Sequence, residues 1–431
     1  MDTVGKRIME IELAYGKTGL TIELPDELNV TVVTPHYVPA VQDERAALLE
    51  ALTRPIASPP LRELVKPTDR VGIVFSDITR PTPNHLVVPA VLYALDHVPA
   101  HHITLFNALG THRANTEEEL RGMLGDDVVR RYRIVQNNAF DPTTQVCLGV
   151  SRFNHEIWVN REFYECDVKI LTGFIEPHFF AGFSGGGKAI LPGMAGQRTV
   201  LGNHDAVMIA HPNATWGVVE HNPIQEEIRE VAEKVHPTFL LNVALNREKR
   251  IVGVFAGDLN SAYAAGCHFV RDHAMVAVDH PFDIVITSNS GYPLDLNLYQ
   301  SVKGMSAAAQ IVRPGGAIII AASCWDGIPE HGMYGELLRA CDSPQAVLEM
   351  VSQPGFLKQD QWQVQIQAQI QLKADVYLYT DNLTDEQIYA ALLKPSRCIE
   401  DTVMQLLKHM GRDARICVLP EGPQTIPYVQ L

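Results

Sequence analysis

The sequence lacks the features of several protein classes. Its seven cysteines are odd in number and scattered, and no two are spaced as C-x-x-C, which argues against a disulfide framework or a cysteine-built zinc site. No apolar run approaches the roughly 18–20 residues needed to span a bilayer, and the N-terminal "MDTVGKRIMEIELAYGKTGL" has no apolar signal segment. We therefore expect a cytoplasmic protein with no membrane partner.

Positive charge is also scarce. Against 50 acidic residues there are 35 basic ones, which gives a net charge of −15. This balance argues against nucleic acid as a partner, because binding the phosphate backbone needs clustered cations. It does not exclude a small anionic substrate, since a few local cations can dominate a cleft. The content of 46% hydrophobic and 20% charged residues is typical of a globular protein.

The order of apolar and polar segments predicts an α/β fold. Seven short apolar runs, rich in β-branched residues, resemble strands buried on both faces, and amphipathic helical patterns lie between many of them. Strands that alternate with helices predict mainly parallel sheets. The seven runs are "DRVGIVFS", "HHITLFNA", "DVKILTGF", "FDIVITSN", "GAIIIAAS", "ADVYLYT" and "RICVLPEG".

The length of 431 residues predicts two domains. We place a larger N-terminal α/β domain at residues 1–272 and a smaller α/β domain at residues 273–431, with an active-site cleft between them. Whether the last helices pack back on the first domain stays open, and a homo-oligomer is compatible with the sequence. The glutamine-rich segment 359–371 alternates polar and apolar residues, so both strand and helix are open for it, and we assign it no function.

One glycine-rich stretch raises the question of phosphate binding. "GFSGGGK", from Gly182 to Lys188, matches the first seven positions of the P-loop pattern G-x-x-x-x-G-K, but Ala189 stands where a Ser or Thr should bind Mg²⁺. Pro192 also interrupts the helix that a P-loop requires. These departures argue against a kinase or ATPase, although glycine N–H groups can still approach a phosphate or another anion.

Reactive side chains stand directly after four of the predicted strands. In open α/β sheets, ligands bind outside the carboxyl ends of the strands, so such ends can converge on one site. Each residue also has a purely structural interpretation, such as a cap or an ion pair, and most of the 17 histidines must be structural. The residues are Asp77 and Arg80; His112 and Arg113; Glu176, His178 and Lys188; and Tyr299, Gln300 and Lys303.

Taken in order, these segments resemble the lactate racemase family that carries a nickel-pincer nucleotide. The resemblance rests on "SDITRPTPN", "GTHR", "GFIEPHFFAGFSGGGKAILPGMAG", "GNHDA" and "YPLDLNLYQSVKG". It extends from "AYGKTGLTIELPDE" to about residue 310, and more weakly to the end of the chain. The block from Glu176 to Gly193 is the most specific part, whereas "GTHR" alone is a weak signal.

The resemblance implies an isomerase that inverts C2 of a 2-hydroxy acid. Lys188 matches the lysine that holds the cofactor covalently, a pyridinium-3-thioamide-5-thiocarboxylic acid mononucleotide that binds nickel, and His204 matches the histidine that completes the nickel site. Sulfur donors with one imidazole in a planar arrangement suit Ni(II). Gly185 and Gly186 match positions beside the cofactor. From the residues alone His211 competes with His204, and either is compatible with a structural role.

The resemblance also assigns the acid–base and substrate residues. His112 and His178 match the pair that takes and returns the substrate's hydroxyl proton, a task suited to the pKa of histidine. Arg80, Tyr299, Gln300 and Lys303 match residues that hold the substrate's oxygens or the cofactor, and Asp77 either orients Arg80 or touches the cofactor. The implied partners are a small 2-hydroxy acid and the enzymes that make the cofactor.

Two departures from the family pattern bear on the substrate. The residue before the lysine is commonly Arg in the family and is Gly187 here, and "LDLNLYQ" replaces the more usual "LDQDLYQ". The predicted acid–base pair, nickel histidine and lysine are unaffected, so the reaction type stands. We expect a lost cation or an altered loop to accommodate a larger or differently charged side chain, so that lactate is one candidate among several.

Two alternatives come from other functional classes. The first is a nucleotide- or anion-binding protein that uses the glycine-rich loop without redox chemistry. The second is a zinc hydrolase built on His112, His178 and His204, which lacks the close spacing of histidines that helps to place zinc ligands.

Overall fold

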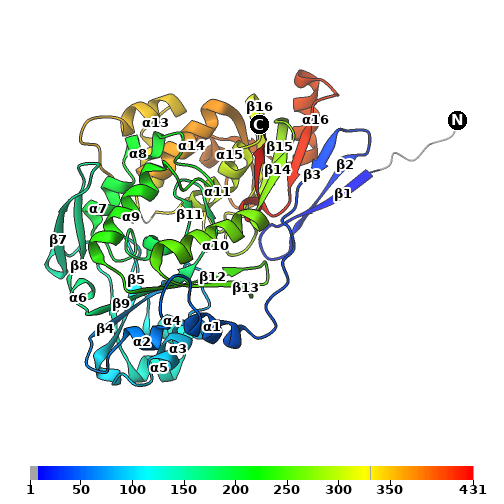
Figure 1. Ribbon diagram of the computed structural model, residues 1–431. Helices are drawn as coiled ribbons and strands as arrows, with labels where there is room; N and C mark the ends of the chain where they lie inside the picture. The colour runs from blue at the N-terminus through cyan, green and yellow to red at the C-terminus, as the bar shows by residue number, and fades with distance from the viewer. Residues whose placement is uncertain (1–7, 331, 431) are drawn as a thin grey trace. The chain divides into compact units, whose positions relative to one another are not determined.

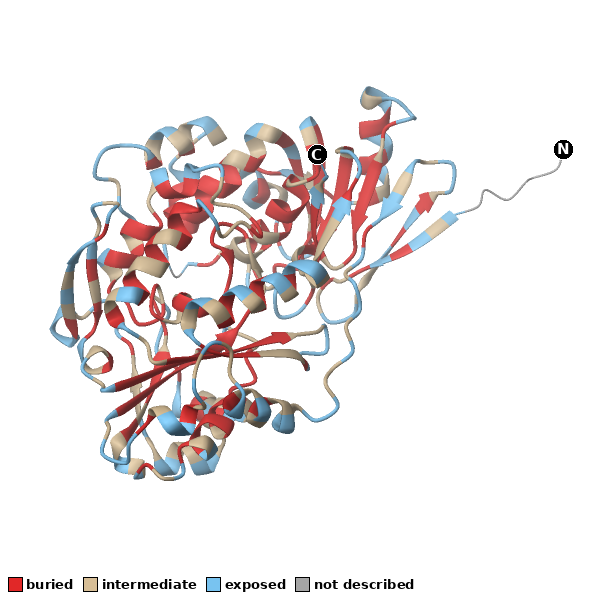
Figure 2. Cartoon of the chain, in the orientation of Figure 1, coloured by how far each residue is buried: buried red, intermediate tan, exposed pale blue. Residues whose placement is uncertain are grey.

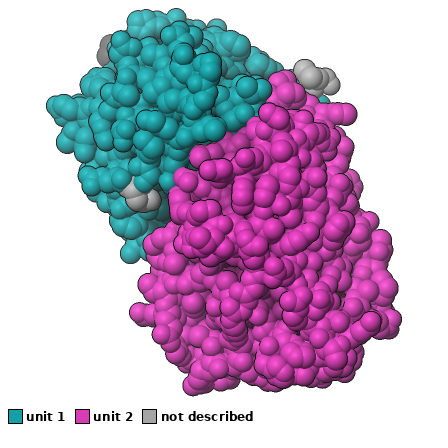
Figure 3. Space-filling view, turned by 90° about the vertical axis from the view of Figure 1, so that its left-hand side faces the viewer, with its two compact units in different colours: residues 1–36, 205–210, 274–431 teal, residues 37–204, 211–273 magenta. Residues whose placement is uncertain are grey.

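The computed structural model describes residues 8–330 and 332–430, which form two compact units (Figure 3). Unit 1 comprises Met1–His36, Asp205–Ala210 and Ala274–Leu431, and unit 2 comprises Tyr37–His204 and His211–His273. These units differ from the predicted limits 1–272 and 273–431 in two segments. The first 36 residues belong with the C-terminal segment because strand β3 (Val30–Val32) pairs with β19 (Ile416–Leu419).

Unit 2 is built on a six-stranded sheet in the order β13-β12-β9-β4-β5-β6 (Figure 1). All neighbours are parallel except β12 and β13, which form an antiparallel pair. Two small antiparallel pairs, β7 with β8 and β10 with β11, accompany it. The strands are β4 (Val71–Ser76), β5 (Ile103–Ala108), β6 (Arg133–Gln136), β7 (Gln145–Val150), β8 (Glu156–Asn160), β9 (Val168–Phe174), β10 (Pro177–His178), β11 (Gly182–Phe183), β12 (Phe239–Leu245) and β13 (Ile251–Gly257).

Helices cover both faces of this sheet. Helices α1 to α5 lie on one face, where alternate residues of β4 such as Ile73 and Phe75 enter a core with Leu48 and Val87, and α9 and α10 lie on the other (Figure 1). Thr116 and Glu119 form the predicted capping box at the start of α4. The helices are α1 (Glu44–Thr53), α2 (Leu61–Leu64), α3 (Asn84–Ala94), α4 (Glu117–Leu124), α5 (Asp126–Arg131), α6 (Arg161–Tyr164), α7 (Gln197–Asn203), α9 (Pro223–Val235) and α10 (Leu259–Ala274).

Unit 1 has a second six-stranded sheet, in the order β18-β17-β16-β15-β19-β3, and all of its neighbours are parallel. The central strands of both sheets are buried along most of their length (Figure 2). An antiparallel pair, β1 (Ile8–Leu13) with β2 (Leu20–Pro25), and a parallel pair, β14 (Met275–Val278) with β20 (Ile426–Val429), complete the strands of this unit. The other strands are β15 (Phe282–Ser288), β16 (Val312–Ala321), β17 (Ala374–Tyr379) and β18 (Lys394–Ser396). The predicted α/β class with mainly parallel sheets is confirmed.

The helices of unit 1 include a central one that the sequence left undecided. The segment 359–371 forms most of helix α14 (Gln361–Lys373), which is buried on nearly every side. Its glutamines can lie in the interior because their side-chain amides find hydrogen-bond partners there. Gln363 donates to the carbonyl of Tyr299, and Gln365 donates to the carbonyl of Ala206. The other helices are α8 (Ala206–Ala210), α11 (Leu298–Ala309), α12 (Tyr334–Arg339), α13 (Pro344–Val351), α15 (Asp385–Ala390) and α16 (Ile399–Met410).

Within the described ranges, no helix combines the length and the apolar character required to cross a membrane.

The buried glutamines of α14 generate a stability prediction. Gln367 accepts a hydrogen bond from the Tyr334 hydroxyl and donates to the carbonyl of Ala391 at 2.8 Å. Replacement by the similarly sized methionine leaves both groups unpaired in the interior, so Gln367→Met should lower the free energy of unfolding by about 2–5 kcal/mol. The control Gln345→Met changes an exposed glutamine and should stay within about 0.5 kcal/mol. Equal urea midpoints for the two variants would contradict this account.

Candidate active site

The predicted site residues of unit 2 lie where the strand order of its sheet reverses. The chain proceeds from β4 to β5 and β6 on one side, then returns to β9 on the other side of β4. Such a reversal leaves a crevice at the carboxyl ends of the strands, where α/β proteins bind ligands. The loop after β4 carries Asp77 and Arg80, the loop after β5 carries His112, and the segment after β9 carries His178 and Lys188.

Asp77 and His112 form a close pair across two of these loops. The Nδ1 atom of His112 lies 2.8 Å from a carboxyl oxygen of Asp77. Asp77 is buried, which by itself raises its pKa, but the hydrogen bond and charge of His112, the charge of Arg80 and the Thr79 hydroxyl together lower that pKa below its ordinary value. Because an ionised carboxylate only accepts, Nδ1 of His112 carries a proton, so in the neutral form of the ring the lone pair is on Nε2.

The pairing of Asp77 with His112 was not foreseen from the sequence. We expected Asp77 to orient Arg80 or to touch the cofactor, and the structure adds a direct contact with the neighbouring loop. The signal that could have found it is topological. Residues 77 and 112 both follow strands, and β4 and β5 are parallel neighbours, so their first loops share one edge of the sheet.

His178 lies in an aromatic cluster after β9. Its ring centroid is 5.0 Å from that of Phe179 and 4.5 Å from that of Phe180. The backbone N–H of Ala181 donates to Nδ1 of His178 at 3.3 Å, which places the proton of the neutral ring on Nε2. His178 therefore presents a proton at the atom where His112 presents a lone pair.

Lys188 follows a turn that only glycine can form. Gly182, Gly185 and Gly186 all have positive φ, and a Cβ on Gly182 would lie 2.1 Å from the carbonyl oxygen of Val218. A Cβ on Gly185 or Gly186 would lie 2.6 Å from Asn242 or from the Tyr263 ring. The glycines thus allow the turn to pack on β12 and α10.

The geometry after Lys188 is not that of a P-loop. Residues Gly186–Ala189 form a short 3₁₀ turn, and the next helix, α7, begins only at Gln197. The N–H of Gly186 donates to the side chain of Asn242 at 2.7 Å, so this amide is already used within the protein. The predicted absence of a helix directly after Lys188 is confirmed.

His204 is buried directly beside this turn. It lies at the end of α7 with 5% of its surface exposed. Its ring centroid is 5.0 Å from that of Phe180, and the Nζ atom of Lys188 is 5.5 Å from the same Phe180 centroid. Burial and the charge of Lys188 lower the pKa of His204 to about 3, so the ring is neutral at pH 7. Nδ1 lies 3.0 Å from the carbonyl oxygen of Val200, which places the proton on Nδ1 and the lone pair on Nε2.

Gly187 does not open a space beside Lys188. It is buried, and a Cβ there would lie 2.9 Å from Cγ2 of Ile228 and 3.2 Å from Cβ of Ala232, both on α9. The position where relatives are expected to carry Arg is therefore filled here by a helix of the same unit. The expectation that Gly187 accommodates a larger substrate side chain is not supported.

In unit 1, one helix, α11, carries Tyr299, Gln300 and Lys303, and it follows strand β15 of the six-stranded sheet. The order of that sheet reverses between β15 and β19, so α11 begins at the corresponding crevice. Asn297 caps α11 by accepting from the N–H of Gln300 at 3.1 Å, and its amide donates to Asp326 at 3.2 Å. An aspartate at 297 could make the first contact but would repel Asp326, which explains one of the two changes in "LDLNLYQ".

Comparison with known proteins identifies the chain. A family model described as the lactate racemase N-terminal domain matches residues 15–217, and one described as the lactate racemase C-terminal domain matches residues 277–426. The lactate racemase of Thermoanaerobacterium thermosaccharolyticum is 35% identical over 421 residues, which cover 96% of this chain and 98% of that protein. The chain belongs to the lactate racemase family. The lactate racemase of Lactiplantibacillus plantarum is also 35% identical, over 96% of this chain and 99% of that protein.

Solved structures agree with this membership. The lactate racemase apoprotein from T. thermosaccharolyticum superposes with a TM-score of 0.91 at 33% identity, covering 98% of this chain and all of that one. A protein from Thermotoga maritima has a TM-score of 0.69 at 20% identity, over 91% of this chain and all of that one, and shows the fold alone. As a lactate racemase family member the protein is an enzyme of the isomerase class. The roles of its single residues stay predictions.

The residues present fit the group that the family resemblance implies. His204 combines a buried neutral ring, an Nδ1–H bonded to a backbone carbonyl and a lone pair on Nε2, the arrangement by which proteins orient a metal-binding imidazole. Within residues 8–330 and 332–430, no cluster of three or more His, Cys, Asp or Glu side chains is placed to hold a metal. Nothing in this part of the chain supports the zinc hydrolase, whereas a group that brings its own metal needs fewer protein ligands.

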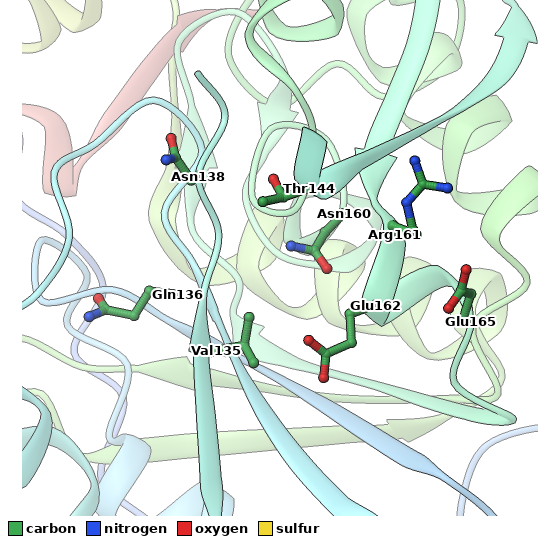
Figure 4. A pocket seen from close by; sticks show the side chains of 8 residues that line it. All are labelled: Val135, Gln136, Asn138, Thr144, Asn160, Arg161, Glu162 and Glu165. Atoms are coloured by element: carbon green, nitrogen blue, oxygen red, sulfur yellow. The ribbon is translucent and has the colours of Figure 1, made fainter. Parts of the chain in front are cut away.

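A cavity elsewhere in unit 2 is distinct from this site. Its volume is about 230 Å³, and its lining includes residues at the end of β6 and the start of α6, such as Gln136 and Glu162 (Figure 4). The carboxyl group of Glu162 is already bound by Arg133. None of the predicted site residues lines this cavity.

The tight glycine turn gives a prediction with a matched control. Gly149 also has positive φ, but a Cβ there would meet no atom within 4 Å. Gly149→Ala should therefore show only the strain of the backbone, about 1–2 kcal/mol, and Gly182→Ala should lose about 1–3 kcal/mol more, because its Cβ overlaps a carbonyl. Urea unfolding of the apoprotein compares the two. Equal losses of unfolding free energy in the two variants would mean that the turn changes shape to admit the added Cβ and that close packing does not fix Lys188.

Proposed function

We propose that this racemase inverts C2 of a 2-hydroxy acid, lactate or a related acid, and that it uses a nickel-pincer nucleotide bound covalently to Lys188. The observation that carries the proposal is the neutral, buried His204 beside Lys188, with both side chains against Phe180. A buried imidazole with its lone pair on Nε2 suits a nickel ion, and the adjacent lysine offers an amine for attachment. The two relatives named lactate racemase support the substrate class.

When bound, the group supplies an acceptor for the C2 hydrogen as hydride, which spares the enzyme from deprotonating a very weak carbon acid. The protein's own residues handle the hydroxyl proton. His112, with its lone pair on Nε2, takes that proton from one enantiomer, and the contact with Asp77 stabilises the imidazolium that forms. On the opposite face, His178 is proposed to exchange the hydroxyl proton: as a neutral ring it takes the proton from the opposite enantiomer, and as the imidazolium so formed it returns the proton when that enantiomer is made.

The remaining predicted residues hold the substrate. A guanidinium binds a carboxylate through two parallel hydrogen bonds, so Arg80 is suited to fix the acid while C2 changes configuration. Tyr299, Gln300 and Lys303 are proposed to bind the other oxygens of the substrate, and Gly185 and Gly186 to lie beside the cofactor. We further propose cofactor-maturation enzymes as partners and the cytoplasm as the compartment.

The covalent and metal-binding roles are tested together by mass and metal analysis. After co-expression with cofactor-maturation enzymes, the intact protein should carry added mass on Lys188 and a stoichiometric amount of nickel. Lys188→Ala should lose the added mass because it has no amine, and His204→Ala should keep the added mass but lose nickel. Lys234→Ala, a lysine at the far end of α9, serves as the control and should behave like the wild type.

An unmodified Lys188 without nickel, from cells that make the cofactor, would refute the proposal. Tight ATP binding that disappears in Lys188→Ala would then favour the nucleotide-binding alternative. The short 3₁₀ turn at Lys188 and the amide of Gly186, which is bonded to Asn242, speak against that alternative.

The two-histidine scheme predicts opposite effects on the two enantiomers. In single turnovers at saturating substrate, Asp77→Asn should slow the formation of bound 2-keto acid from one enantiomer by about 100-fold, because an amide also stabilises the wrong tautomer of His112. The other enantiomer should react normally in that variant, and His178→Asn should show the reverse preference. Equal slowing of both enantiomers by Asp77→Asn would contradict the assignment of His112 to one face.

A further inference from the structure

We propose that Glu227, in the middle of α9, is a positioning residue that fixes His204 relative to Lys188. The proposal rests on the roles proposed above for these two residues. Nothing in the family pattern that identified the site involves Glu227, and in the sequence it is one of several acidic residues in an amphipathic helix.

Glu227 lies at the centre of a largely buried polar network. It is 0% exposed, and one of its carboxyl oxygens accepts from the Ser151 hydroxyl at 2.5 Å and from Nδ1 of His155 at 2.9 Å. Its second oxygen accepts from the side-chain amide of Asn203 at 2.9 Å. Asn203 is the last residue of α7 and directly precedes His204.

A second residue of α7, Gly202, also contacts the network. A Cβ on Gly202 would lie 2.7 Å from the ring of His155, so the helix backbone packs directly on the imidazole that Glu227 holds. Asn203 donates in addition to the carbonyl of Ile224, at 3.2 Å, on the first turn of α9. The two residues before His204 are therefore fixed by contacts that lead to Glu227.

The residue after Glu227 contacts the backbone beside Lys188. Ile228 packs on Gly187 so closely that a Cβ there would lie 2.9 Å from its Cγ2 atom. Consecutive residues of a helix are separated by a rise of about 1.5 Å. One short piece of α9 thus holds the residue before the predicted nickel ligand and the residue before the predicted cofactor lysine.

Two further residues, the cap of α9 and one in its first turn, connect this helix to the surroundings of Lys188. Asn222, which caps the helix, donates to the carbonyl of Phe180 at 2.8 Å, and Phe180 is the ring against which Lys188 and His204 both lie. Gln225 donates to the hydroxyl of Tyr263 at 3.2 Å, and the ring of Tyr263 packs on Gly186. The helix and its cap are therefore attached to the site at four positions, and the side chain of Glu227 is hydrogen-bonded to α7.

A buried carboxyl group such as that of Glu227 is not expected at a position whose only role is packing. Burying it requires several hydrogen-bond donors, and an apolar side chain of similar volume often stabilises a core as well or better. Three donors contact Glu227: Ser151 and His155 from the loop between β7 and β8, and Asn203 from α7. Such convergence orients groups as well as filling space, and a metal-binding histidine needs orientation, because partners beyond the ligand itself tune its affinity.

The test compares Glu227→Gln with Glu230→Gln, a control on the same helix. Glu230 binds Arg152, the neighbour of Ser151, and does not reach Asn203. Glutamine at 227 turns an amide toward at least one of the three donors. In protein co-expressed with maturation enzymes, Glu227→Gln should keep the added mass on Lys188 but release nickel to a chelator about 10- to 100-fold faster than the wild type. Glu230→Gln should release nickel at the wild-type rate.

A second variant and a second measurement keep the test decisive. If Glu227→Gln does not fold, Asn203→Ala removes the same link to α7 and should give the same faster release. In the apoprotein, which needs no cofactor, the Cε1–H NMR resonance of the His204 ring should shift in Glu227→Gln and stay in place in Glu230→Gln.

The outcomes separate this inference from the proposed function. Nickel release and a His204 resonance that are the same in Glu227→Gln and Glu230→Gln would overturn the role of Glu227 while leaving the function intact. A wild-type protein that acquires neither the added mass nor nickel would refute the function. The apoprotein resonance would still decide whether Glu227 fixes the ring of His204.

Discussion

The site depends on one constraint, which is the close packing of the turn that carries Lys188 against neighbouring elements of unit 2. The turn passes so near to β12, α10 and α9 that Gly185, Gly186 and Gly187 have no room for a Cβ. The glycines that suggested a phosphate cradle are therefore required by packing inside the protein. Because the turn is held on three sides, the lysine that follows it starts from a fixed backbone, and α9 joins that backbone to the end of α7.

Electrostatics then differentiates three histidines that look alike in the sequence. A carboxylate faces Nδ1 of His112, a backbone N–H faces Nδ1 of His178, and a backbone carbonyl faces Nδ1 of His204. These partners assign a lone pair, a proton and a lone pair to the three Nε2 atoms. Burial beside the charge of Lys188 keeps His204 neutral, whereas His112 remains 45% exposed and can exchange protons with water. The three histidines thus differ chemically because of the groups that the fold places beside them, and these neighbours cannot be read from the residue type.

Much of the fold could be predicted from the sequence, because buried parallel strands produce continuous apolar runs. All seven predicted runs are strands, and the strand ends that carry Asp77, His112 and Tyr299 were recognised. The antiparallel pair β12 and β13 was missed, and so was the attachment of the first 36 residues to unit 1, because both depend on pairing between distant segments. Helix α14 was left undecided because its buried glutamines hide the usual periodicity. In the site, residue types could be matched to a pattern, but the contact of Asp77 with His112 and the place of Gly187 against α9 depend on the fold.

The position of His204 in the chain adds a last constraint. His204 is the final residue of unit 2 before the chain enters unit 1 for Asp205–Ala210 and then returns. In unit 1 this short segment is anchored by Gln365, whose amide donates to the carbonyl of Ala206 at 2.8 Å. Within unit 2, Glu227 holds the residue that precedes the predicted nickel ligand, and within unit 1 a buried glutamine of α14 holds the short segment that follows it.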